Sequence, residues 1–100
     1  MKTQVYISGR ITGLTDEEVS KNFNKAEAFL NETEHYYPVN PLKLEHRWHD
    51  QSWSSFMKVD IQALCKCNAI YMLNNYKESK GALIELQLAR DLGMKIMFEL

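Results

Sequence analysis

The chain has 100 residues, of which 45% are hydrophobic, and a formal net charge of -1. This length fits one small domain spanning residues 1–100, and a pI of about 6.3 provides no general attraction to nucleic acid or to an anionic membrane. No apolar run approaches the roughly 20 residues that span a bilayer. Because the N-terminus leads directly into a strand-like segment, we expect a cytoplasmic protein without a signal peptide.

Strand and helix patterns alternate along the chain. In chain order they predict a strand at 4–8, a helix from 15 to about 32, a strand at 35–39, a helical turn and a loop over 42–50, a helix from 51 or 52, a strand at 69–73, a helix at 79–92 and a strand at 95–99. Thr15 and Glu18 have the spacing of a capping box, and Gly93 is placed to end the last helix. Pro38 indicates an edge position for its strand, or the strand's end.

The alternation predicts an α/β fold of the flavodoxin or Rossmann-like type. We expect three layers, with a parallel four-stranded sheet in the order 2-1-3-4 and helices on both faces. Ligands bind such sheets beyond the carboxyl ends of the central strands. The loops at 9–13 and 74–79 follow the two predicted central strands, so they are expected to meet at one crevice.

Ser79 stands at the N-cap position of the last predicted helix, and Gly81 follows in its first turn. Free amide groups and the helix dipole at such a turn favour a phosphate or a carboxylate. Glu85 faces the same general direction, so it either acts on a group held there or is an ordinary solvated glutamate. Asp60 lies on the apolar stripe of its helix, which favours a functional role over a structural cap or ion pair.

Cysteine and histidine spacings do not predict a metal site, and we expect no cofactor. Cys65 and Cys67 lie on a predicted helix at a spacing that points them to different faces, so they are expected to be reduced cysteines. His46 and His49 are three residues apart, but no third ligand is evident. Trp48 and Trp53 could stack on a nucleobase, pack a lid onto the core or form a subunit interface.

Three blocks of the sequence resemble one known superfamily. The segment 6–13, Tyr-Ile-Ser-Gly-Arg-Ile-Thr-Gly, resembles the first strand and loop of the nucleoside 2-deoxyribosyltransferases, and Asp60 and Ser79-x-Gly81-x-x-x-Glu85 match its other two blocks. The resemblance is closest to small proteins of the domain-of-unknown-function 4406 type. The 2′-deoxynucleoside 5′-phosphate N-hydrolases are similar in the same blocks.

The resemblance implies a role for each matched residue. Glu85 would be the nucleophile that attacks the anomeric carbon of the sugar, Asp60 would bind the sugar or assist departure of the base, and Tyr6 would orient the nucleophile. The phosphate would be bound by residues of the first loop and the last helix. These are Ser8, Gly9, Arg10, Ser79 and Gly81. The family also forms dimers or larger assemblies, so a homo-oligomer is expected.

The leading hypothesis is therefore cleavage or transfer of the N-glycosidic bond of a nucleoside or deoxynucleoside 5′-monophosphate. An alternative is a nucleotide-binding or sensing module of the same fold without turnover. Arg10 and Asn68 depart from the relatives' pattern, and the chain ends at Leu100 without the transferases' C-terminal extension. A third hypothesis is a structural protein with a vestigial pocket.

Overall fold

Four parallel strands form the central sheet of the computed structural model, which describes residues 1–46 and 52–100. The strands are β1 (Thr3–Ser8), β2 (Tyr36–Val39), β3 (Ala69–Met72) and β4 (Lys95–Phe98). Their order is β2-β1-β3-β4, and Tyr6 of β1 lies in register with Val39 on one side and Ile70 on the other. The predicted order is confirmed, and Pro38 lies in an edge strand as its missing N–H group indicated.

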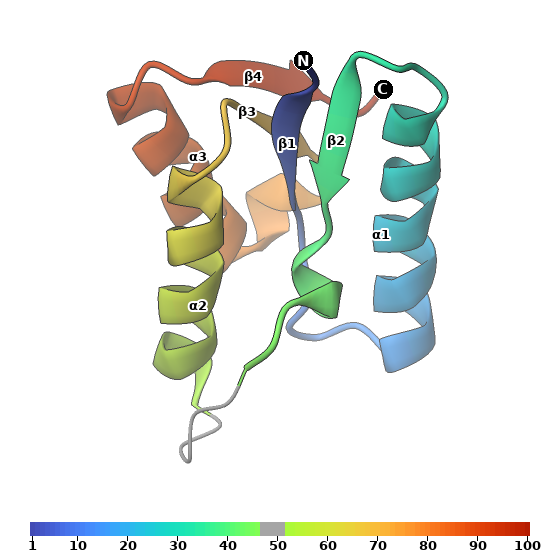
Figure 1. The fold of residues 1–100 in the computed structure, drawn as a ribbon. Helices are drawn as coiled ribbons and strands as arrows, with labels where there is room; N and C mark the ends of the chain where they lie inside the picture. The colour runs from blue at the N-terminus through green and yellow to red at the C-terminus, as the bar shows by residue number, and fades with distance from the viewer. Residues whose placement is uncertain (47–51) are drawn as a thin grey trace.

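Helices cover both faces of this sheet (Figure 1). Helix α1 (Asp16–Asn31) lies on one face, and α2 (Trp53–Cys65) and α3 (Lys80–Asp91) lie on the other. The predicted three-layer α/β fold is confirmed. Among the described residues, no helix is both long enough and apolar enough to cross a membrane.

The alternation of side chains along β1 divides the core into two layers and also supplies the site. Val5 and Ile7 pack against α1 with Phe23 and Leu30, whereas Tyr6 packs on the opposite face with residues of α2 and α3. Because successive strand residues point to opposite faces, Ser8 shares the face of Tyr6. Both hydroxyl groups are therefore directed toward α3.

Local signals set the ends of the helices. Thr15 and Glu18 form the predicted capping box at α1, Ser52 caps α2, and the Ser79 hydroxyl accepts a hydrogen bond from the Ala82 amide at α3. Gly93 has φ of +70°, which L side chains rarely adopt, and follows the last helix as predicted.

Three local details differ from the predicted elements. The link after β3 contains a short 3-10 helix, η2 (Tyr76–Glu78), and a second one, η1 (Pro41–Lys43), begins one residue earlier than the predicted turn. Cys67 lies outside α2, because the helix ends at Cys65 and the thiol donates back to the Ala63 carbonyl. Residues 47–50 of the predicted loop lie outside the described residues.

Gly9 occupies a position where a side chain has no room. A Cβ atom built there would lie 2.4 Å from a methyl carbon of Leu73 and 2.8 Å from its Cβ. Gly9 is also buried at the end of β1. The close packing of the first loop on the residue after β3 therefore requires glycine at this position, and it holds the two loops at the carboxyl edge of the sheet together.

Candidate functional site

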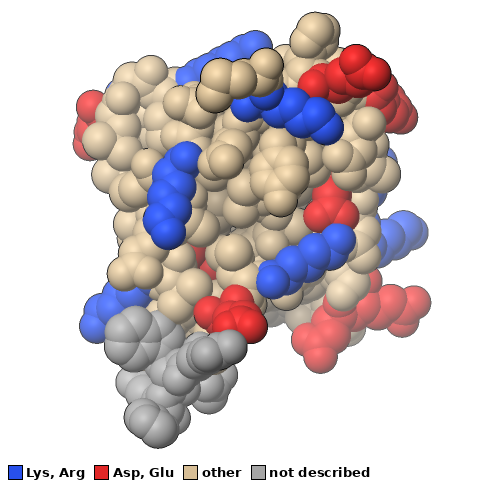
Figure 2. Space-filling model, in the orientation of Figure 1, with Lys and Arg blue, Asp and Glu red and all other residues tan. Residues whose placement is uncertain are grey.

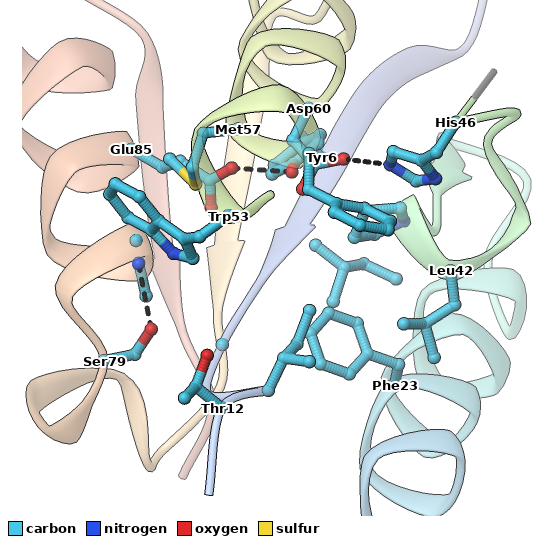
Figure 3. A pocket seen from close by; sticks show the side chains of 17 residues that line it. Tyr6, Thr12, Phe23, Leu42, His46, Trp53, Met57, Asp60, Ser79 and Glu85 are labelled. Atoms are coloured by element: carbon cyan, nitrogen blue, oxygen red, sulfur yellow. Dashed lines mark hydrogen bonds and ion pairs between the residues drawn. The ribbon is translucent and has the colours of Figure 1, made fainter. Parts of the chain in front are cut away.

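A cavity of about 380 Å³ opens beside the carboxyl end of β1 (Figure 3). This volume lies within the range of small-molecule sites. The cavity is lined from all the elements around it: β1 and its following loop, α1, η1, α2 and α3. Its polar lining residues are Tyr6, Thr12, His46, Asp60, Ser79 and Glu85. Its larger apolar lining residues are Ile7, Ile11, Phe23, Pro41, Leu42, Trp53, Phe56 and Met57.

Glu85 lies on the buried side of α3 and has two hydroxyl partners. The Tyr6 hydroxyl donates to Oε2 at 2.7 Å, and the Ser8 hydroxyl donates to Oε1 at 2.7 Å. The residue is 5% exposed. Both carboxylate oxygens are therefore held in a fixed orientation at the wall of the cavity, which excludes the interpretation of Glu85 as a solvated surface glutamate.

Burial changes the acidity of this carboxyl group. Removal from water raises the pKa of Glu85 from 4.5 to about 7, against the lowering effect of the hydrogen bonds from Ser8 and Tyr6, and the charge of Asp60 raises it further. Burial, followed by the charge of Glu85, also raises the pKa of the Tyr6 phenol well above its ordinary value. Near neutral pH, Glu85 can therefore be present either as an acid or as a carboxylate, while Tyr6 stays a hydrogen-bond donor.

Asp60 is the second buried carboxyl group of the cavity. It is 8% exposed, and its Oδ1 atom lies 2.9 Å from Nε2 of His46. Burial raises the pKa of Asp60, and the hydrogen bond and charge of His46 act in the opposite direction. The burial of Asp60 agrees with its place on the apolar stripe of α2.

The first turn of α3 forms one end of the cavity. Ser79 caps the helix through the Ala82 amide, and Gly81 lies one turn before Glu85 on the same face. A Cβ atom on Gly81 would come within 3.0 Å of Sδ of Met57 and 3.7 Å of Nε1 of Trp53. Gly81 thus allows α2 to approach the turn. Amide groups at the start of a helix are the ones that favour an anion, and those of α3 lie at this end of the cavity.

Two residues predicted to bind phosphate have other partners. Ser8 is 1% exposed and donates to Glu85. The Arg10 guanidinium pairs with Glu78 at 2.9 Å and donates to the Thr12 carbonyl at 3.1 Å, and the residue is not among those that line the cavity. Arg10 therefore stabilises the loop that carries Thr12, and a direct contact of Ser8 or Arg10 with phosphate stays a prediction.

The structure adds residues that sequence patterns did not assign to the site. His46 lies against Asp60, and its ring centroid is 4.6 Å from that of Phe56. Phe23 reaches the cavity from the apolar stripe of α1, and Leu42 reaches it from η1. The cluster of histidine and tryptophan was the one signal for His46. Trp48 and His49 lie outside the described residues, so the alternatives stated for them stay predictions.

Trp53 lies at the mouth of the cavity. It is 43% exposed, and the Lys80 ammonium lies 4.8 Å from its ring centroid. A cation is attracted to the face of an indole ring, and this contact is exposed to solvent here. The pair therefore flanks the first turn of α3, and Lys80 brings a positive charge near it.

Comparison with known proteins identifies a family but not an activity. No curated protein matches the chain. The model of one family, described as a domain of unknown function, matches residues 3–98, almost the whole chain. The chain therefore belongs to the DUF4406 family.

Proposed function

We propose that this protein cleaves or transfers the N-glycosidic bond of a nucleoside or deoxynucleoside 5′-monophosphate, with Glu85 as the nucleophile. The observation that carries the proposal is the buried Glu85 carboxyl, held between the hydroxyls of Tyr6 and Ser8 at the wall of a cavity of ligand size. The proposed kinship with the nucleoside 2-deoxyribosyltransferases, through the three sequence blocks, supports the same chemistry.

Two carboxyl groups in one cavity suit cleavage of a glycosidic bond. In the retaining form of this reaction, one carboxylate attacks the anomeric carbon and the other group manages the proton of the leaving group. Glu85 is the attacking group in this proposal, because both its oxygens have donors that fix their direction. Asp60 contacts the sugar or serves the leaving base. Neither role requires a cofactor.

The uneven lining of the cavity supports a nucleotide as the ligand. Ser79 and Gly81 belong to a helix N-terminus, which favours an anionic phosphate, and Lys80 lies next to them. Phe23 and Leu42 lie across the cavity from Ser79 in Figure 3. With Phe56, they supply apolar lining that suits the faces of a nucleobase. In this arrangement the sugar lies between the two ends, beside Glu85.

We also propose that the protein acts as a homodimer or a larger homo-oligomer. Large apolar side chains lie exposed on several elements, including Phe29 of α1 at 53% and Phe98 of β4 at 47%. On the face drawn in Figure 2, acidic and basic side chains are interspersed and do not gather into one patch of a single sign. Light scattering on a sizing column measures the assembly directly.

The proposed activity predicts the release of free base. We expect wild-type protein, incubated with a panel of deoxynucleoside and ribonucleoside 5′-monophosphates and the matching nucleosides, to release base from at least one of the monophosphates. Chromatography of the products measures this, and addition of a second base as an acceptor separates transfer from hydrolysis. Preference for the monophosphates over the nucleosides is the expected result of the phosphate end of the cavity.

The same panel separates the proposed enzyme from a binding module. Thermal stabilisation by a nucleotide without release of base from any member would contradict the proposed activity and would favour nucleotide binding alone. If no nucleotide stabilises the protein and no base is released, both the proposed activity and nucleotide binding are contradicted.

A further inference from the structure

The His46–Asp60 pair lies next to the proposed nucleophile, and the imidazole of His46 has no role in the proposal so far. His46 Nε2 and Asp60 Oδ1 are 2.9 Å apart, and the two side chains are only 16% and 11% exposed. The residues come from different segments, since His46 follows η1 and Asp60 lies in the middle of α2. The Phe56 ring packs against the imidazole in a tilted arrangement, with the ring planes at 40° to each other.

The ionisable groups of the cavity follow one another across it. Figure 3 shows Glu85, Tyr6, Asp60 and His46 in this order, with the hydrogen bond of Tyr6 to Glu85 and that of His46 to Asp60 at the two ends. The charge of Asp60 acts on both Tyr6 and Glu85. Asp60 therefore lies between the proposed nucleophile and the imidazole.

Two carboxylates that share a buried cavity oppose each other's ionisation. A proton held by the His46–Asp60 pair neutralises one of the two negative charges, and it does so at the side of the cavity away from Glu85. The charge of Asp60 acts on Tyr6 from β1 and on Glu85 from α3, and the imidazole of His46 packs against the ring of Phe56. This arrangement keeps Glu85 available as a carboxylate while a proton stays nearby.

We propose that His46 supplies, through Asp60, the proton that the leaving base takes up. This inference rests on the proposed glycosidic cleavage. His46 is a positioning and proton-supplying residue in this account, and Asp60 is the group that faces the base. Phe56 packs against the imidazole, and Leu42 lines the same side of the cavity in Figure 3, so an apolar surface that fits a base lies at this end.

Cleavage in this proposal exchanges one bond of the anomeric carbon for another. A Glu85 oxygen forms a bond to the anomeric carbon while the bond from that carbon to the base nitrogen breaks. The electron pair of the broken bond goes to the base, and the one proton of the pair moves from His46 to Asp60 and from Asp60 to the base. In hydrolysis, water then attacks the anomeric carbon, its proton returns to the pair, and the bond to Glu85 breaks to restore the carboxylate.

His46→Gln tests this role, because a glutamine amide can still donate to Asp60 but cannot supply a proton. Two substrates are compared, a deoxynucleoside monophosphate that wild type cleaves and the 4-nitrophenyl 2-deoxyriboside 5-phosphate, whose leaving nitrophenolate needs no proton. We expect His46→Gln to release base about 10²- to 10⁴-fold more slowly than wild type. Release of nitrophenolate is expected to stay within about a few-fold of the wild-type rate. This leaving group needs no proton, so the substitution can act only through effects on binding that both substrates share.

Two controls separate this inference from the proposed function. His35→Gln makes the same change at an exposed histidine before β2 and is expected to leave both rates unchanged. Glu85→Gln is expected to abolish both reactions. The pH profile gives a further readout, since wild type is expected to lose base release at alkaline pH while its release of nitrophenolate persists.

Equal slowing of both reactions by His46→Gln would overturn the inference, because it would indicate a role in folding or binding. An unchanged rate of base release would overturn it as well. If wild type releases neither base nor nitrophenolate, the proposed function is overturned, and this inference with it.

Discussion

Glu85→Gln is expected to lower base release by on the order of 10⁴-fold or more, because an amide cannot form the glycosyl ester that a carboxylate forms. The substitution keeps the shape of the side chain. The amide oxygen can still accept a hydrogen bond from Tyr6 or Ser8, both of which contact Glu85 at 2.7 Å. The cavity should therefore remain intact, and only the chemical step should be lost. Single-turnover release of base measures this step.

Nucleotide binding by Glu85→Gln is expected to survive. A ligand at 100 times its dissociation constant should add about 2.7 kcal/mol to the free energy of unfolding of the variant, as it does for wild type. Glu34→Gln, the same change at an exposed position after α1, is the matched control and should retain full activity. Full activity in Glu85→Gln would exclude Glu85 as the nucleophile, and loss of binding in it would show that the variant no longer reports on chemistry alone.

The stability of wild type is expected to fall as the pH rises from about 4.5 to about 7, by up to about 3 kcal/mol from Glu85 alone. Burial raises the pKa of this carboxyl from 4.5 to about 7 in the folded protein. Between these two values the folded state holds a proton that the unfolded state has lost, so the free energy of unfolding decreases with rising pH. The raised pKa of Asp60 acts in the same direction.

Denaturant unfolding at pH 5 and pH 8 checks this sign. Glu85→Gln removes the ionisable group, so its stability should change less between the two pH values than that of wild type. At pH 8 the variant should be the more stable protein, because wild type then buries a charged carboxylate there. The Glu34→Gln control should follow wild type. The same pH dependence in wild type and in Glu85→Gln would mean that Glu85 is ionised in the folded state already at low pH.

Sequence patterns were sufficient for the fold because local and long-range signals agreed. The capping box at Thr15, the N-cap at Ser79 and the glycine after α3 mark helix ends by short-range chemistry, and the alternation of strands with helices leaves few possible sheet orders. The link that contains η2 was harder to assign, since three residues of a 3-10 helix carry no periodic pattern.

The residues of the site could be predicted only where they lie on a helix or a strand, whose side chains point in directions that repeat along the sequence. Asp60 lies on the apolar stripe of α2 and Glu85 follows the capped start of α3, so their direction could be inferred from helical spacing. Ser8 could have been placed beside Glu85, because it shares the face of Tyr6 on β1. His46 could not be placed, because it follows an irregular segment and meets Asp60 14 residues later in the chain.

Arg10 shows the same limit for a charged side chain. Its position after β1 was compatible with a phosphate contact, but the choice between partners depends on where Glu78 lies in the folded chain. The two residues are 68 apart and come together only because β1 and β3 are neighbours in the sheet. An ion pair of this kind has no signal in the local sequence.

The most direct measurement is the mass of the protein after reaction with a 2′-fluoro-2′-deoxyarabinonucleoside 5′-monophosphate. The fluorine withdraws electrons from the anomeric centre, so the second step, attack of water on the glycosyl ester, is expected to slow enough for the ester to accumulate. We expect one glycosyl phosphate to be added per chain, located by peptide mapping on Glu85 and absent in Glu85→Gln. An adduct on another residue, or release of base by wild type through direct attack of water with inversion at the anomeric carbon, would contradict it.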